Sequence, residues 1–158
     1  MPIIRLRPVQ PSDYPILYTH QADEVSRHMA AFGAKYALDE AAHEARWERL
    51  LANPEGIART ILADEVVVGN ILKFVMFEEN ELAYWLGREH WGRGIATQAV
   101  RLFLQEYTER PLFGRAVKDN LASQRVLEKC GFRLVREERS FAEARGEEVD
   151  EVIMRLDS

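Results

Sequence analysis

The stretch from Tyr84 to Ala99, YWLGREHWGRGIATQA, holds the residues whose types and spacing point most clearly to chemistry. An apolar run stops at Gly87, a turn carries Gly92 and Gly94, and a helix-forming sequence follows. A glycine-rich turn between a strand and a helix exposes unpaired backbone N–H groups at the positive end of the helix dipole. The turn therefore predicts a binding site for a phosphate compound.

Three other interpretations of this turn can be weighed against the sequence. A Walker A loop needs four residues between its glycines and then Gly-Lys-Ser/Thr, and GRGIATQ has neither. A dinucleotide-binding turn would have a third glycine where this chain has Thr97, and it would lie in an early parallel βαβ unit rather than after helices and hairpins. A tight loop without any ligand is the third alternative.

The elements that must position this turn can be predicted from hydrophobic periodicity and turn residues. Residues 3–9 alternate apolar and basic side chains as a first strand, and helices are expected over 12–21, over 22–29 and from Asp39 to before Asn53. The expected elements that follow are three meander strands (IARTILAD, EVVVGNILKFVMF, ELAYWLG), an amphipathic helix ending before Pro111, the strand PLFGRAVK, a helix from Asp119 or Asn120 to Gly131, and two strands (FRLVREER, DEVIMRL) joined through SFAEARGEEV. This order predicts one α+β domain over residues 1–158, with helices on the faces of the sheet.

Composition narrows the class of protein further. Of the 158 residues, 47% are hydrophobic and 30% charged, which is typical of a single globular domain. The net charge of -5 argues against a nucleic-acid partner, and no apolar run is long enough to span a membrane. The start of the chain does not resemble a signal peptide, so we expect a cytoplasmic protein. The single cysteine and the scattered His20, His28, His43 and His90 predict neither a disulfide nor a metal site.

Two motifs taken together, ELAYWLGREHWGRGIATQAV and KDNLASQRVLEKCGF, resemble the signatures of the GNAT superfamily of N-acetyltransferases, and within it the ribosomal-protein N-terminal acetyltransferase-like branch. The first superfamily motif is Gln/Arg-x-x-Gly-x-Gly/Ala. Gly94 and Ala96 match its last two fixed positions, and Trp91 takes the first, a form common in that branch. The resemblance covers nearly the whole chain and implies a mixed, mostly antiparallel sheet that is splayed between its fourth and fifth strands.

The resemblance also implies that acetyl-CoA lies between those two strands as a cosubstrate, without a metal. Its pantetheine would run along the backbone of Trp85 and Leu86, and Asn120 and Ser123 of the second motif would face its thioester arm. Its pyrophosphate would contact the amides of the turn, at positions that match Gly92, Arg93, Gly94, Ile95, Ala96 and Thr97.

Acetyl transfer to an amine needs a base for the ammonium proton and a group that polarises the thioester carbonyl. A main-chain N–H near Leu86 can polarise the carbonyl. Glu81 is the expected base because it matches the Glu-x-x-Tyr-Trp pattern of the branch, with Asp150 and Glu151 as weaker candidates. The alternative for Glu81 is a solvated glutamate beside a turn.

The leaving thiolate needs a proton donor. Many superfamily members use a tyrosine seven residues after the motif asparagine, and here that position is Leu127. Ser123 is then the expected relay, the alternative being an ordinary helix-surface serine. Tyr84 alternates to the strand face opposite Glu81 and is expected in the core or the pocket wall. Cys130 has no obvious His partner, so we expect a buried structural cysteine.

We therefore expect an N-acetyltransferase that moves an acetyl group from acetyl-CoA to a primary amine by direct attack in a ternary complex. A non-catalytic acyl-CoA binding or sensing module is the alternative, and a nucleotide-binding oxidoreductase is a distant third. The acceptor stays open between a protein N-terminus, an antibiotic, a polyamine and a free amino acid, and the resemblance implies that residues 22–35 and 140–148 form its pocket. Oligomeric state is also open, a homodimer included.

Overall fold

The computed structural model describes residues 1–31 and 39–158. The helices in chain order are α1 (Tyr14–Ala22), α2 (Glu24–Ala30), α3 (Glu40–Ala52), α4 (Ile95–Glu106) and α5 (Leu121–Lys129), with short 3-10 turns η1 (Pro11–Asp13) and η3 (Arg88–His90). The strands are β1 (Ile4–Pro8), β2 (Ile57–Ala63), β3 (Val66–Met76), β4 (Glu79–Leu86), β5 (Leu112–Val117), β6 (Arg133–Ala142) and β7 (Glu147–Leu156). The predicted order of elements is confirmed. No helix within these two ranges has the length and apolar character needed to cross a bilayer.

The strands form one sheet in the order β1-β2-β3-β4-β5-β7-β6. Neighbours run antiparallel except β4 and β5, which run parallel and pair only at Glu81 with Phe113 and Leu82 with Gly114. Beyond Leu82 and Gly114 the two strands separate. The predicted splay between the fourth and fifth strands is therefore confirmed.

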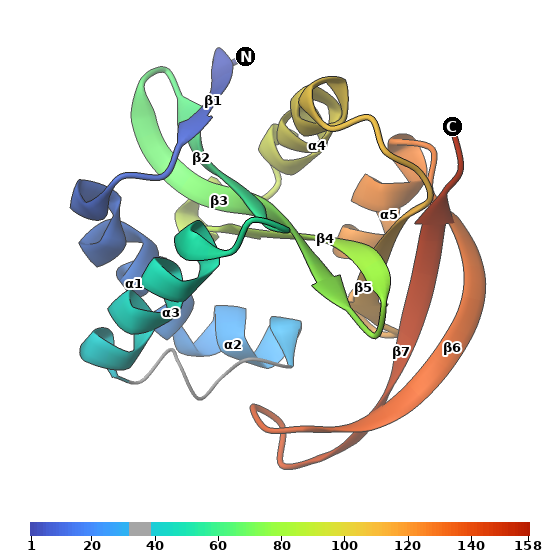
Figure 1. The fold of residues 1–158 in the computed structure, drawn as a ribbon. Coiled ribbons are helices and arrows are strands. Elements are labelled where there is room, and N and C mark those ends of the chain that lie inside the picture. The colour runs from blue at the N-terminus through green and yellow to red at the C-terminus, as the bar shows by residue number, and fades with distance from the viewer. Residues whose placement is uncertain (32–38) are drawn as a thin grey trace.

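Helices cover both faces of this sheet, as predicted (Figure 1). On one face, α4 and α5 bury Phe103 and Leu127 against Leu82 and Met154 of the sheet. On the other face, Leu17 of α1 and Trp47 of α3 pack in a separate apolar cluster with the sheet. Each face of the sheet is therefore packed by its own apolar cluster, and the gap between β4 and β5 lies between these two helical layers.

Two tight hairpins set the register of β4. Asp64 and Glu65 join β2 to β3, and Phe77 and Glu78 join β3 to β4, all four with positive φ. Two-residue turns with positive φ at both positions match the twist of antiparallel strands. β4 consequently begins earlier than predicted, and Glu81 lies inside the strand rather than at its start.

The last hairpin is also longer in strand than the sequence predicted. β6 and β7 stay paired from Arg133 with Arg155 to Ala142 with Glu147, so most of the expected connection is strand. The polar residues of this segment had indicated a loop. Cross-strand ion pairs such as Arg139–Asp150 instead stabilise the hairpin.

Candidate active site

The gap between β4 and β5 opens into a cavity of about 610 Å³. Its walls are Ala83 to Leu86 of β4, Arg115 to Val117 of β5, and parts of the glycine turn, α2 and α5. The sequence-predicted residues that line it are Trp85, Leu86, Gly92, Gly94, Ile95, Ala96, Thr97, Asn120 and Ser123. Arg93, the remaining predicted residue of the turn, has an exposed side chain that does not line this wall.

The glycine turn presents bare backbone to the cavity. Gly92 and Gly94 have φ of 74° and 75°, a conformation that strains other residues, and a Cβ at either position would meet nothing within 4 Å. The first amides of α4 have no acceptor within the helix. Among the backbone hydrogen bonds of turns, loops and caps in the described ranges, none has the amide of residue 92, 93 or 94 as its donor. The turn thus combines free donors, open space and the positive end of a helix.

Two tryptophans fix the turn and β4 in place. The indole Nε1 of Trp91 donates to the carbonyl oxygen of Leu86 at 3.2 Å, which ties the turn to the end of β4. The indole Nε1 of Trp85 donates to the carbonyl oxygen of His20 at 3.1 Å, which ties β4 to α1. Both rings also line the cavity.

Asn120 and Gly131 define α5, as the sequence predicts. The Oδ1 of Asn120 accepts from the Ser123 amide at 3.3 Å as the N-cap, and Gly131 follows the helix with φ of 96°. The Nδ2 of Asn120 also donates to the carbonyl oxygen of Met29 at 3.4 Å. One side chain therefore starts α5 and connects it to α2 across the cavity wall.

Tyr84 and Ser123 meet from opposite sides of the cavity. The Tyr84 hydroxyl lies 3.0 Å from the Ser123 Oγ, and burial raises the pKa of Tyr84 to about 12. Leu127 is 2% exposed and packs directly over Gly114, so its position belongs to the core. The sequence placed Tyr84 only as core or wall. The alternation of side chains along β4 was the available signal, because it puts Tyr84 on the same face as Leu82 and Leu86, toward α5.

Glu81 lies in the interior rather than in solvent. It is 1% exposed, so the alternative of a solvated turn glutamate is wrong. Arg115 Nε donates to Glu81 Oε1 at 2.9 Å, and Glu81 Oε2 has no partner among the described residues. Burial raises the pKa of Glu81 to about 7, despite the opposing effect of Arg115. Glu81 is not part of the cavity wall, whereas its partner Arg115 is.

Arg115 links three carboxylates from three strands. Besides Glu81 it donates from Nη1 to Glu138 at 2.9 Å and to Glu151 at 3.3 Å. Glu151 lines the cavity, and burial raises its pKa. Asp150 instead pairs with Arg139 at the surface. Of the two weaker candidate bases, only Glu151 therefore faces the cavity.

These residues can be compared with known proteins. A model of the acetyltransferase (GNAT) domain matches residues 4–133. The chain belongs to the GNAT acetyltransferase family. A search of curated proteins finds no match. The predicted family is therefore confirmed by the domain match over most of the chain.

Solved structures share the GNAT fold over almost the whole chain. Spermidine N-acetyltransferase from Vibrio cholerae, in complex with CoA and spermine, is 12% identical with a TM-score of 0.84 and covers 98% of this chain and 95% of its own. RimJ from Mycobacterium smegmatis, in complex with CoA-disulfide, is 19% identical with a TM-score of 0.83, and the match covers 99% of this chain and 83% of RimJ. Ribosomal-protein-S5-alanine acetyltransferase from Vibrio fischeri is 15% identical with a TM-score of 0.77, and the match covers 98% of this chain and 92% of that enzyme. Ribosomal-protein acetyltransferases, the predicted branch, are thus among the structures that this GNAT domain resembles.

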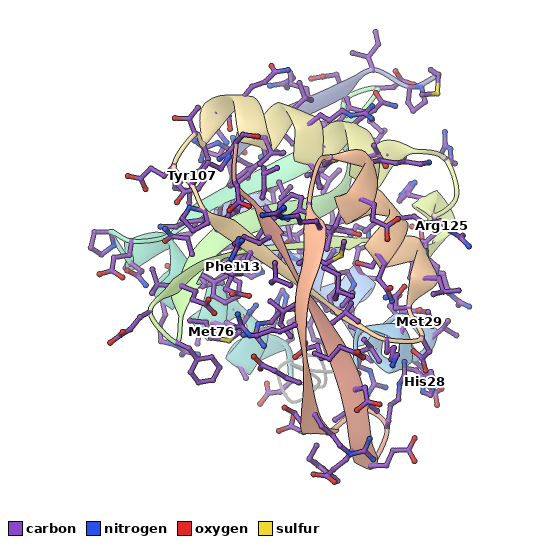
Figure 2. All side chains as sticks on the ribbon, turned by 90° about the vertical axis from the view of Figure 1, so that its right-hand side faces the viewer. His28, Met29, Met76, Tyr107, Phe113 and Arg125 are labelled. Carbon is purple, nitrogen blue, oxygen red and sulfur yellow. The ribbon has the colours of Figure 1, made fainter. Side chains whose placement is uncertain are left out.

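The structure also adds basic residues to the cavity wall of this GNAT domain. Arg125 and Lys129, four residues apart on α5, both line the cavity. Figure 2 shows Arg125 on the side of the molecule where Met29 and His28 of α2 also lie. This pair was not among the residues expected from the sequence, although residues four apart on a helix share a face. Two cations beside the free amides of the turn suit a polyanionic ligand.

The predicted acceptor segments contribute unequally. Ser26, Met29 and Ala30 of α2 line the cavity, while residues 32–35 lie outside the described ranges. Ala144 of the β6–β7 turn lies in a separate hollow of about 360 Å³ beside α2. Arg145 of the same turn donates to the carbonyl oxygen of His28 at 2.9 Å. Of the two segments expected to bind the acceptor, only α2 therefore contributes described residues to the main cavity.

Cys130 is half-buried at the edge of the core, rather than fully buried as expected. Its Sγ lies 3.7 Å from the carbonyl oxygen of Thr97, and burial raises the pKa of the thiol. A thiol with a raised pKa is a poor nucleophile, because the thiolate is the reactive form.

Proposed function

We propose that this GNAT domain transfers the acetyl group of acetyl-CoA to a primary amine by direct attack in a ternary complex. The observation that carries the proposal is the convergence of three features on one cavity: free amides at the start of α4, the Tyr84–Ser123 pair, and the Arg115-bound carboxylates. The first suits the pyrophosphate of the cofactor, and the other two supply groups that can move protons.

Acetyl-CoA would bind along the splayed strands. The proposal places its pyrophosphate on the amides of residues 92–97, with Arg125 and Lys129 supplying positive charge for its phosphates. The pantetheine would follow the backbone of Trp85 and Leu86, where β4 has left β5 and has main-chain groups available. A main-chain N–H at this end of β4 would polarise the thioester carbonyl.

Transfer forms a carbon–nitrogen bond and breaks the carbon–sulfur bond. The neutral amine nitrogen attacks the carbonyl carbon, the thiolate leaves and takes a proton from a donor in the cavity, and the proton that the nitrogen loses on becoming an amide restores that donor through solvent. We assign the role of donor to the Tyr84–Ser123 pair, with Ser123 as the relay, because a phenol with a pKa of about 12 is protonated at neutral pH. Holding both reactants in one cavity supplies much of the acceleration.

The proton lost by the ammonium form of the acceptor would pass to a carboxylate. Glu81 is the proposed base, since burial brings its pKa to about 7, close to the optimum for a base at neutral pH. Glu81 is screened from the cavity by Arg115, so the proton would travel through water or through Glu151, which lines the cavity. The same carboxylates would favour a positively charged acceptor, either a protein N-terminus or a small-molecule amine.

The experiment that tests this proposal combines binding with turnover. Purified protein is titrated by calorimetry with acetyl-CoA, desacetyl-CoA and a dinucleotide, and then assayed for release of free thiol with polyamines, amino acids and N-terminal peptides. Micromolar binding of the CoA compounds together with thiol release for one acceptor class is the expected result. Binding without thiol release for any amine would favour the sensing module, and absence of CoA binding would refute the placement of the site.

A further inference from the structure

Three residues with metal-ligating side chains meet at one edge of the cofactor cavity. His20 comes from α1, and Glu89 and His90 come from the η3 turn that leads out of β4. One ligand atom from each lies within 4.8 Å of the other two. His90 also lines the cavity, so the cluster lies between the N-terminal helices and the cofactor turn.

The imidazole rings of His20 and His90 pack against each other, and Nε2 of His90 lies 3.5 Å from Oε1 of Glu89. Their ring centroids are 6.3 Å apart, edge to face. The Nδ1 atoms of His20 and His90 are both buried and have no hydrogen-bond partner among the described residues. His20 is 6% exposed, and a buried polar nitrogen without a partner is costly unless something else satisfies the ring.

The backbone leaves room for these rings at Gly87. A Cβ at this position would lie 2.7 Å from Cδ2 and Nε2 of His20 and 3.2 Å from Cδ2 of His90. Because the His20 ring is buried, a larger residue at position 87 would displace it and would also press on the half-buried ring of His90. The His90 amide donates to the Gly87 carbonyl oxygen at 2.9 Å, which fixes the turn around them.

We propose that His20, Glu89 and His90 form a binding site for a divalent transition-metal ion of the zinc class. Two imidazoles and one carboxylate are a ligand set that Zn²⁺ accepts with a fourth position left open. Ligand atoms about 2.1 Å from a common ion lie roughly 3.4 Å apart in a tetrahedron, so the cluster must contract slightly. Glu89 can supply this movement because its side chain is 70% exposed.

A bound ion would tie α1 to the turn that ends β4. These segments are already joined by the Trp85 indole bond to the His20 carbonyl oxygen. The ion would therefore stabilise the wall of the cavity without taking part in acetyl transfer, and the proposal does not depend on that reaction.

The test uses the full chain without an affinity tag, freed of metal by a chelator. Calorimetric titration with ZnCl₂ is expected to show one ion per chain, and Co²⁺ is expected to give a visible spectrum that Zn²⁺ abolishes. H90A and E89Q should each weaken Zn²⁺ binding by more than about tenfold, since loss of even an outer-shell partner costs about 10–100-fold. Both variants alter partly exposed positions, so they avoid the folding defect that changing the buried His20 could cause.

The matched control is H28A, which removes an exposed histidine of α2 outside the cluster. It should bind Zn²⁺ like the wild type. No stoichiometric binding by the wild type at micromolar Zn²⁺, or an equal loss in H28A and H90A, would overturn the proposal.

Discussion

The hydroxyls of Tyr84 and Ser123 are positioned to act as one unit. They lie 3.0 Å apart, on a strand and a helix that face each other across the cavity. Burial keeps the phenol protonated by raising its pKa to about 12, so Tyr84 can hold a proton that Ser123 passes on. Leu127, at the position where many relatives carry an acid, is locked in the core over Gly114 and cannot take this role.

Ser123→Ala should lower kcat by roughly a hundredfold, at the low end of what general acid–base catalysis supplies, with little change in the Kd for acetyl-CoA. Tyr84→Phe should have a similar effect, and the double variant should be little worse than either single one, because the residues act in series. Thiol-release kinetics and calorimetry measure the two quantities. Ser12→Ala, at an exposed serine that does not line the cavity, is the control. An unchanged rate in Ser123→Ala would return it to an ordinary helix-surface serine.

Gly94 is required for its conformation and for the space beside it. Gly94→Leu should abolish acetyl-CoA binding because the side chain would occupy the open space that the pyrophosphate needs. The left-handed backbone, with φ of 75°, adds a cost of about 1 kcal/mol in stability. Gly146→Leu has the same type of strain, with φ of 68° and open space around it, but lies outside the cavity wall. Calorimetry should show lost binding only in the Gly94 variant, while thermal unfolding shifts similarly in both. Unaltered affinity in Gly94→Leu would contradict the placement of the cofactor.

At the scale of elements, the site depends on how α5 is started and held. The N-cap residue Asn120 satisfies the Ser123 amide and also donates to the Met29 carbonyl of α2. α5 in turn carries Ser123, Arg125 and Lys129 to the cavity. The cap thus positions three cavity-lining residues through one side chain.

Asn120→Ala should lower the free energy of unfolding by about 1 kcal/mol, the usual cost of a lost N-cap. Asn120→Asp keeps an oxygen for the cap and loses only the donation to Met29, so it should retain most of the stability. Urea denaturation of both variants measures the difference. Equal losses in the two variants would show that the bond to α2, rather than the cap, carries the stabilisation.

At the scale of the whole molecule, the sheet carries a partly buried charge network that spans β4 to β6. Arg115 bonds Glu81, Glu138 and Glu151, each from a different strand. The Arg136 hydrogen bond lowers the pKa of Glu138, whereas burial raises those of Glu81 and Glu151. The network therefore holds a carboxylate with a lowered pKa close to two with raised pKa values. We expect pH to change stability and activity through these groups.

The sign of the pH effect on stability follows from Glu81. Its pKa of about 7 in the folded chain lies above the ordinary value of 4.5, so the folded state binds the proton more tightly between these values. This contribution to stability is fully present below pH 4.5 and is lost as pH rises toward and through about 7. Wild-type protein should therefore lose more unfolding free energy between pH 5 and pH 8 than Glu81→Gln does, as measured by urea denaturation at both pH values. Equal pH slopes in the two proteins would contradict the raised pKa.

Activity should respond to pH in the opposite direction. A base must be deprotonated to act, so kcat/KM of the wild type should rise through about pH 7, where Glu81 titrates. Glu81→Gln should be slower and lack this rise, whereas Glu151→Gln should keep it if Glu151 only conducts the proton. A rise that survives in Glu81→Gln and disappears in Glu151→Gln would assign the base to Glu151.

Much of the fold was predictable because its signals are local. The N-cap Asn120 and the helix-ending Gly131 mark the two ends of α5 in the sequence. The glycine turn likewise predicts free amides before α4. The early start of β4 was missed because its hairpin turn is formed by Phe77 and Glu78, which are not residues that usually mark a turn with positive φ. That error led to the solvated alternative for Glu81, a residue that lies fully inside the sheet.

The sequence by itself determined the order of elements, the GNAT resemblance and the part of the cavity wall formed by the end of β4, the glycine turn and the start of α5, since these depend on periodicity, caps and contiguous motifs. Only the tertiary structure decided which side chains meet: Tyr84 with Ser123, Glu81 with Arg115, and His20 with His90. Each pair joins residues far apart in the chain. The physical reason is that these contacts depend on strand register and on how helices pack on the sheet. Neither can be predicted from the residues next to each position in the sequence.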